Sequence, residues 1–174
     1  MDFYRTLSEV IDMRSFSNLW YWIALAVLWS SSSHWVLGVP FDMIQRARRL
    51  GGQTEMDLEA LVAINTRRFL GISRTAAVPI FVVLSFMLSC LLLLAIWYRM
   101  EFAQAVLFLL VPMIFIGWLS LRSALKIEGG ETSGPALYRR LLIHRRLVQV
   151  VGLVSIFITS MFGMYQNMNL SILN

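Results

Sequence analysis

Two histidines are the residues of this sequence best suited to bind a metal or a haem. Neutral imidazole is a frequent metal ligand, and His34 and His144 on neighbouring helices would suit a b-type haem. The simpler interpretation is that both are polar residues at a membrane interface, because haem ligands usually lie deeper in the apolar region. We therefore expect no cofactor and no metal, and His34 and His144 are the only candidates for either.

Small residues recur at four-residue spacing in two apolar segments. Ser85 and Ser89 form one stripe, and Ser155, Thr159 and Gly163 form the other. This spacing places each set on one face of a helix, where small side chains let two membrane helices approach closely. We assign these residues to helix packing, against either this chain or another subunit.

Two arginine pairs precede the last apolar segment. Arg139 and Arg140 form the first pair, and Arg145 and Arg146 form the second. Such residues orient a membrane protein and contact anionic lipid head groups. The alternative is that they dock onto an acidic surface of a partner. The basic residues lie beside apolar segments, so we expect membrane lipids as partners and no nucleic acid.

The sequence contains no recognisable catalytic site. Phosphate-binding loops, zinc spacings, nucleophile elbows and paired carboxylates are all missing from it. The cores of the apolar segments also contain no Asp, Glu, Lys or Arg, the residues on which ion and proton pathways usually depend. We expect a protein that is not an enzyme and does not transport by itself.

The composition requires a membrane. Of the 174 residues, 58% are hydrophobic and 14% are charged, whereas soluble domains carry about 25% charged residues. Four apolar runs reach the length of about 20 residues that crosses a bilayer as a helix. They predict one all-α domain over residues 1–174 with short amphipathic interfacial helices, and the spans are residues 19–39, 76–98, 102–121 and 147–168.

The basic residues predict the orientation. Twelve of the 15 Lys and Arg residues fall in the segments 40–75 and 122–146. Loops enriched in Lys and Arg stay in the cytoplasm. Both segments are therefore predicted to be cytoplasmic, and both termini are predicted to lie in the periplasm of a bacterium with this protein in its inner membrane.

The cytoplasmic segments are themselves predicted to contain helices. Pro40 precedes a short helix over Phe41–Leu50, which Gly51 and Gly52 end, and Thr54 is the expected N-cap of a second helix. Pro135 suits the first turn of a third helix. If this helix continues to residue 168, it is about 50 Å long at 1.5 Å per residue.

Two stretches resemble a known family. The run Met13-Arg-Ser-Phe-Ser-Asn-Leu-Trp20, the run Ser33-His-Trp-Val-Leu-Gly-Val-Pro-Phe-Asp42 and the segment 148–167 are similar to small alphaproteobacterial four-helix inner-membrane proteins. Members are sometimes labelled as a component of the Suf iron–sulfur assembly complex. The resemblance implies an inner-membrane protein associated with cofactor assembly. Cys90 is the only cysteine, so the chain alone could not supply the thiolates that hold a cluster.

These observations predict a non-catalytic accessory or structural subunit of a larger inner-membrane complex, respiratory or photosynthetic. One alternative is a membrane accessory in iron–sulfur or haem cofactor assembly. Another is the small membrane subunit of a multi-part transporter. The partners expected are other membrane-protein subunits and lipids.

Overall fold

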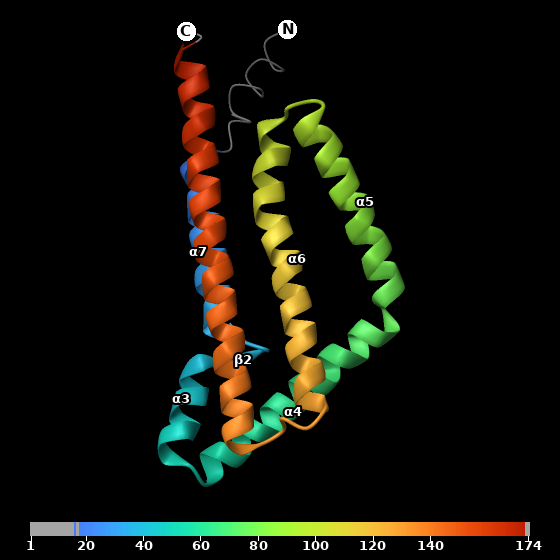
Figure 1. Ribbon diagram of the computed structural model, residues 1–174, viewed down its shortest axis with the longest axis vertical. Helices are drawn as coiled ribbons and strands as arrows, with labels where there is room; N and C mark the ends of the chain where they lie inside the picture. Colours follow the sequence, from blue (N-terminus) through green and yellow to red (C-terminus); the bar gives the residue numbers. More distant parts are fainter. Residues whose placement is uncertain (1–15, 17, 173–174) are drawn as a thin grey trace, which may run out of the picture.

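The computed structural model describes residue 16 and residues 18–172, and 88% of this part is helical. The helices run mostly along one long axis, while one helix crosses their ends (Figure 1). The elements in chain order are α2 (Leu19–His34), β1 (Trp35–Val36), β2 (Val39–Pro40), α3 (Phe41–Leu50), α4 (Gln53–Thr75), α5 (Ala77–Ile96), α6 (Glu101–Glu128) and α7 (Gly134–Ile172).

Three of these helices are long and apolar enough to cross a membrane. They are α5, α6 and α7, so the chain is all-α and has the character of a multi-pass membrane protein. The N-terminal helix is shorter than expected, because α2 ends at His34 instead of continuing to residue 39. Its 16 residues span about 24 Å at 1.5 Å per residue, less than the ~30 Å of a hydrocarbon core.

A tight hairpin ends α2. Trp35 pairs with Pro40 and Val36 with Val39 in an antiparallel register. Leu37 and Gly38 form the two-residue turn with φ values of 52° and 76°, as the right-handed twist of a hairpin favours. This hairpin was not predicted from the sequence, and it occupies the last part of the expected first span.

The helix over Phe41–Leu50 begins and ends as predicted. Pro40 is its N-cap residue, and Gly51 ends it with φ of 62°. The predicted cap of the next helix is wrong, because Gly52 is the N-cap residue of α4. The Thr54 hydroxyl instead donates a hydrogen bond of 2.8 Å to the Gly51 carbonyl.

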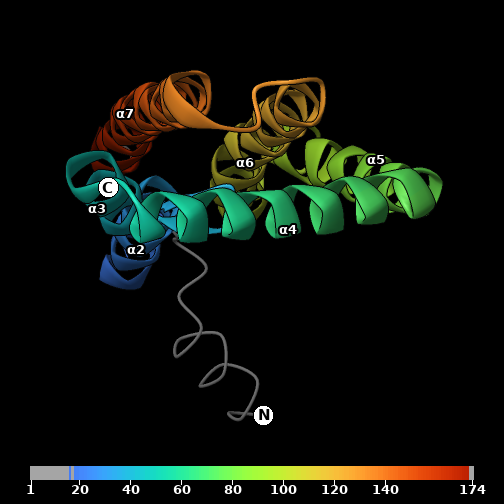
Figure 2. The same cartoon turned by 90° about the horizontal axis from the view of Figure 1, so that it is seen from below.

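The helix α4 crosses beneath the other helices, and α5 rises from its far end (Figure 2). The chain bends at Ala76, between Thr75 and Ala77. Pro79 explains this position, because proline has no N–H to donate to the carbonyl four residues earlier and its ring clashes with it. That carbonyl belongs to Thr75, where α4 ends.

The helix predicted to start at Pro135 is unbroken. It is α7, with 39 residues. Its first residue is held against α4, because the Gly134 N–H donates a 2.8 Å hydrogen bond to Glu59 Oε1.

Two apolar cores hold the helices together. The first lies at the α4 end, where the hairpin, α3 and α4 meet the adjoining ends of α6 and α7; its buried residues are Val36, Val39, Ile44, Ala47, Leu58, Val62, Ile127, Leu137 and Leu141. The second lies further along α2, α6 and α7 and contains Leu25, Trp29, Ile116 and Val148. A space that is not wholly apolar lies among α2, the hairpin, α4, α6 and α7.

Candidate functional site

A cavity of about 450 Å³ lies where the end of α2 and the hairpin turn face α4, α6 and α7. The hairpin, α4, α6 and α7 supply apolar walls, which include Trp35, Ile116 and Val148. Its polar lining residues are Ser32, Asn65, Thr66, Arg68, Ser120 and His144. We call this space the polar cavity.

The hairpin turn fixes one side of the polar cavity. The Asn65 side-chain amide donates a 3.1 Å hydrogen bond to the Gly38 carbonyl. A Cβ atom at Gly38 would lie 3.1 Å from Asn65 Nδ2, and the positive φ of Gly38 also favours glycine. The turn therefore needs Gly38 in order to bring α4 against the hairpin.

His144 forms part of the cavity wall and is 2% exposed. Its Nδ1 lies 3.2 Å from the Ser123 hydroxyl. When that hydroxyl donates, the neutral ring carries its proton on Nε2, and Nε2 has no hydrogen-bond partner among the described residues. The cavity wall thus contains a largely buried imidazole whose Nε2 has no described hydrogen-bond partner.

Thr66 adds a second unused polar group. Its side chain is 5% exposed, and Oγ1 is buried without a hydrogen-bond partner in the described part of the chain. Buried hydroxyls are usually hydrogen-bonded, because an unsatisfied one loses its interaction with water. The Thr66 hydroxyl is therefore an unsatisfied buried group within the wall of the cavity.

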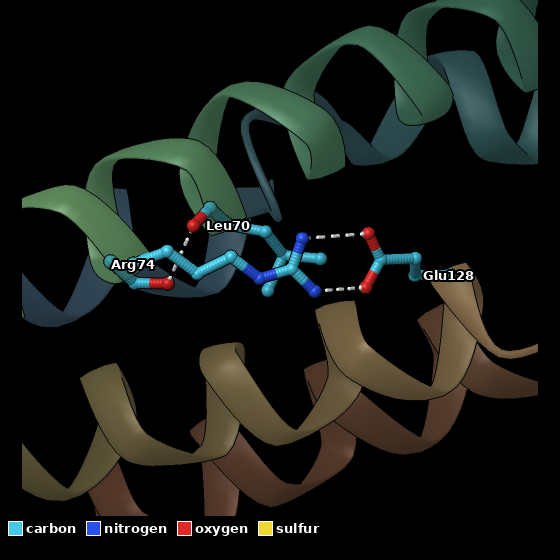
Figure 3. Close-up of polar contacts among 4 residues, drawn as sticks. Leu70, Arg74 and Glu128 are labelled. Carbon is cyan, nitrogen blue, oxygen red and sulfur yellow. Dashed lines mark hydrogen bonds and ion pairs between the residues drawn. The ribbon is translucent and has the colours of Figure 1, made fainter.

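Arg68 supplies the only charged side chain among the described residues of the cavity lining. It pairs with no carboxylate that the structure describes. Arg74, two turns further along α4, differs: its guanidinium contacts both carboxylate oxygens of Glu128 on α6, at 3.2 and 2.6 Å (Figure 3). The charge of Arg68 thus remains uncompensated beside the cavity.

The two histidines do not share this cavity. His34 is exposed at the end of α2, and its ring packs edge-to-face on Trp35 with centroids 6.0 Å apart. His144 lines the polar cavity, whereas His34 does not. Across the described residues, no group of three or more His, Cys, Asp or Glu could hold a metal ion.

The small residues predicted on the last helix lie inside the protein. Ser155 and Thr159 are 7% and 0% exposed, and the Ser155 hydroxyl donates a 3.4 Å hydrogen bond to the Phe108 carbonyl. Pro112, inside α6, leaves that carbonyl without its usual helical donor. Ser155 therefore satisfies a backbone group that the proline frees.

Gly163 also faces another segment. A Cβ atom there would lie 3.3 Å from Trp22 Cζ2 and 3.4 Å from Phe16 Cδ1. The sequence analysis missed a closer contact at Gly152, where a Cβ atom would lie 2.7 Å from Trp29 Cε3. The signal was present, because Gly152 precedes Ser155 by three residues and so shares its helical face.

The small residues predicted on α5 have different surroundings. Ser89 is exposed and Ser85 is half-buried. The Ser89 hydroxyl donates a 2.8 Å hydrogen bond to the Ser85 carbonyl, one turn earlier in the same helix. Within the described structure, no side chain of another helix hydrogen-bonds to this stripe.

An apolar groove of about 770 Å³ runs between α5, α6 and α7. Leu92 and Ile96 line it on α5, and they continue the helical face of Ser85 and Ser89. Figure 1 shows that α5 and α6 meet at the turn that joins them and diverge toward α4. The stripe therefore lies where the two helices are further apart.

The four arginines proposed for docking divide into two kinds. Arg140 forms an ion pair with Glu131, and this contact lowers the pKa of the Glu131 carboxyl. Arg145 Nε donates a 3.2 Å hydrogen bond to the Ser33 carbonyl, and its guanidinium lies 3.3 Å from the ring centre of Phe41. Both therefore stabilise the fold.

The other two, Arg139 and Arg146, are exposed. Together with Arg48 on α3 they line a groove of about 620 Å³ that also includes Tyr138 and Leu142. We call it the basic groove. The sequence analysis did not connect Arg48 with the pairs, because this contact depends on how α3 packs against α7.

No family model matches the sequence, and neither the curated proteins nor the solved structures include a significant match.

Proposed function

We propose that this protein is a non-catalytic subunit of a larger inner-membrane assembly, respiratory or photosynthetic. In this proposal α2 is a short fourth crossing beside α5, α6 and α7. The α4 end, which carries most of the basic residues, faces the cytoplasm, and both termini face the periplasm.

The proposal rests on the position of α5, which diverges from α6 toward α4 (Figure 1). Within the protein, 6% of the most apolar part of α5 is buried, compared with 28% for α7. Lipid can cover an apolar helix, but small residues in register favour close approach by a second helix. The stripe of Ser85 and Ser89, together with the adjoining apolar groove, therefore suits a membrane helix of another subunit.

The basic groove supports the same function at the other end of the molecule. Arg48, Arg139 and Arg146 are exposed and have no acidic partner among the described residues. An acidic cytoplasmic surface of the same assembly would complement this groove. Charges at the edge of an interface mainly speed and orient association.

The experiment is native mass spectrometry of the protein extracted in mild detergent from its own membrane. We expect a reproducible complex with at least one further membrane subunit. The double variant Ser85→Leu/Ser89→Leu should deplete this complex, because two bulky side chains would hold the partner helix away.

Met87→Leu is the matched control, because Met87 is 44% exposed on the opposite face of α5. It should leave the complex intact. Recovery of the wild-type protein only as a monomer or a homo-oligomer would contradict the proposal.

The two alternatives give different results in the same preparation. A haem-related accessory would show a Soret absorption band that is lost on replacing His144 or His34. A transporter subunit would co-purify with a large permease, and its deletion would abolish transport of a substrate.

A further inference from the structure

We propose that the polar cavity binds an anionic phosphate group, carried either by a membrane lipid or by a small soluble phosphate compound. This inference does not depend on the larger assembly, because each residue that it uses lies within this chain.

The charge of the cavity favours an anion. Arg68 is an exposed guanidinium at the cavity, and none of the described lining residues is Asp or Glu. Guanidinium groups bind phosphate with two parallel hydrogen bonds. An anion in the cavity would therefore meet a positive charge that no described carboxylate neutralises.

Neutral polar side chains line the same cavity as the Arg68 guanidinium. His144 is 2% exposed, and its only described hydrogen bond uses Nδ1, which leaves Nε2 without a described partner. Ser120 of α6 lines the same cavity, and its hydroxyl likewise bonds to no described residue. The same space is thus lined by the Arg68 guanidinium of α4, a hydroxyl of α6 and an imidazole of α7. These groups can donate to an acceptor-rich group, and a phosphate has only acceptor oxygens when fully ionised.

The size and the walls indicate more than an isolated water molecule. The cavity volume of about 450 Å³ greatly exceeds the ~30 Å³ that a water occupies in the liquid. Trp35, Phe69 and Ile116 provide apolar walls beside the polar donors. This combination of polar and apolar walls suits an amphiphilic ligand. Its phosphate would contact Arg68, and its apolar part would pack against the apolar walls.

The test compares two adjacent arginines of α4. Arg67 and Arg68 are both exposed, but Arg68 lines the cavity and Arg67 does not. Wild type, Arg68→Gln and Arg67→Gln would be purified in a zwitterionic detergent. Each would then be titrated with phosphatidylglycerol, with phosphatidylcholine and with inorganic phosphate, and bound ligand would be counted by native mass spectrometry and calorimetry.

We expect the wild-type protein to retain phosphatidylglycerol or inorganic phosphate in preference to phosphatidylcholine. Arg68→Gln should weaken this binding by about tenfold, the loss typical of one charge-assisted contact. Arg67→Gln should change it less than about twofold, as expected for a screened surface charge.

Competition between phosphatidylglycerol and inorganic phosphate distinguishes a lipid head-group site from a site for a soluble phosphate compound. Binding of inorganic phosphate that displaces the lipid indicates a soluble phosphate compound, whereas lipid that phosphate does not displace indicates a head-group site. Ser120→Leu, which removes one hydroxyl and adds an apolar side chain to the cavity wall while leaving Arg68 in place, should weaken binding in either case. The proposal is overturned if neither anion binds better than phosphatidylcholine, or if Arg67→Gln and Arg68→Gln have equal effects.

Discussion

The helices α7 and α5 both present small residues on one face, but their surroundings differ. Trp22 and Trp29 of α2 lie against Gly163 and Gly152 on α7. On α5, Ser89 is exposed and hydrogen-bonds only to its own helix among the described contacts. A small-residue stripe therefore identifies the face of a helix that can be approached closely, and it does not identify the neighbour.

The physical reason for this difference between α7 and α5 is the solvent around an apolar helix. In water, an apolar face such as that of α5 would be driven against the rest of the protein. In lipid this driving force between helices is missing, and association depends on packing and interhelical hydrogen bonds. A membrane helix can thus remain splayed until a partner with a complementary surface arrives.

The largest effect on stability should come from Gly152→Ala. The added Cβ atom would lie 2.7 Å from Trp29 Cε3, so α2 and α7 must move apart at a cost of about 1–3 kcal/mol. Thermal unfolding in detergent, followed by circular dichroism, measures this loss. Gly117→Ala in α6 is the control, because no atom apart from the neighbouring residues and backbone of its own helix lies within 4 Å of its Cβ position. Equal unfolding temperatures for the two variants would contradict the α2–α7 contact.

Gly163→Ala should have a smaller effect. Its Cβ atom would lie 3.3 Å from Trp22 and 3.4 Å from Phe16, distances that a shift of a few tenths of an ångström relieves. We expect a loss of about 0–1 kcal/mol, since the better helix propensity of alanine offsets part of the crowding. The same unfolding assay measures this loss of stability. A larger loss than that of Gly152→Ala would contradict the prediction that Gly152 is the more crowded of the two positions.

The ion pair between Arg74 and Glu128 tests how α4 is held on α6. The two side chains are 61% and 46% exposed, so water screens their attraction. A double-mutant cycle with Arg74→Gln and Glu128→Gln should give a coupling free energy of about 0.2–1 kcal/mol. The coupling should fall in high salt, and a value that does not change with salt would argue against an exposed pair.

The smallest effect on the isolated protein should come from Ser89→Leu. Ser89 contacts no other helix through a hydrogen bond in the described structure, so the unfolding free energy should change by less than about 0.5 kcal/mol. A strong destabilisation would mean that α5 packs against this protein itself more closely than the structure shows, and would remove the contrast with α7.

The sequence predicted several features of the fold correctly. The helix over Phe41–Leu50 appears in the structure, as does a helix whose first turn contains Pro135, and this second helix continues beyond residue 168. Both predictions used a proline at the start, and the first also used the glycines that end the helix. Local signals act within a few residues of the element, so they can be read without knowing the fold.

The candidate site was predicted less well. His144 was named as a candidate haem or metal ligand together with His34, but His34 does not line the same cavity. Asn65, Thr66 and Arg68 were not named as cavity residues. Their role depends on α4 crossing beneath α2 and α6, and neither residue type nor spacing within α4 contains that information.

An all-α protein with helices long and apolar enough for a membrane follows from the amino-acid sequence alone. Lipid offers no hydrogen-bond partners, so an apolar segment of sufficient length must satisfy its backbone as a helix. The folded structure was needed to show that a hairpin follows α2 after His34, that Gly152 packs against Trp29, and that Arg68 and His144 line the same cavity. These features depend on contacts between residues far apart in the chain, because packing is set by which surfaces fit together rather than by local pattern.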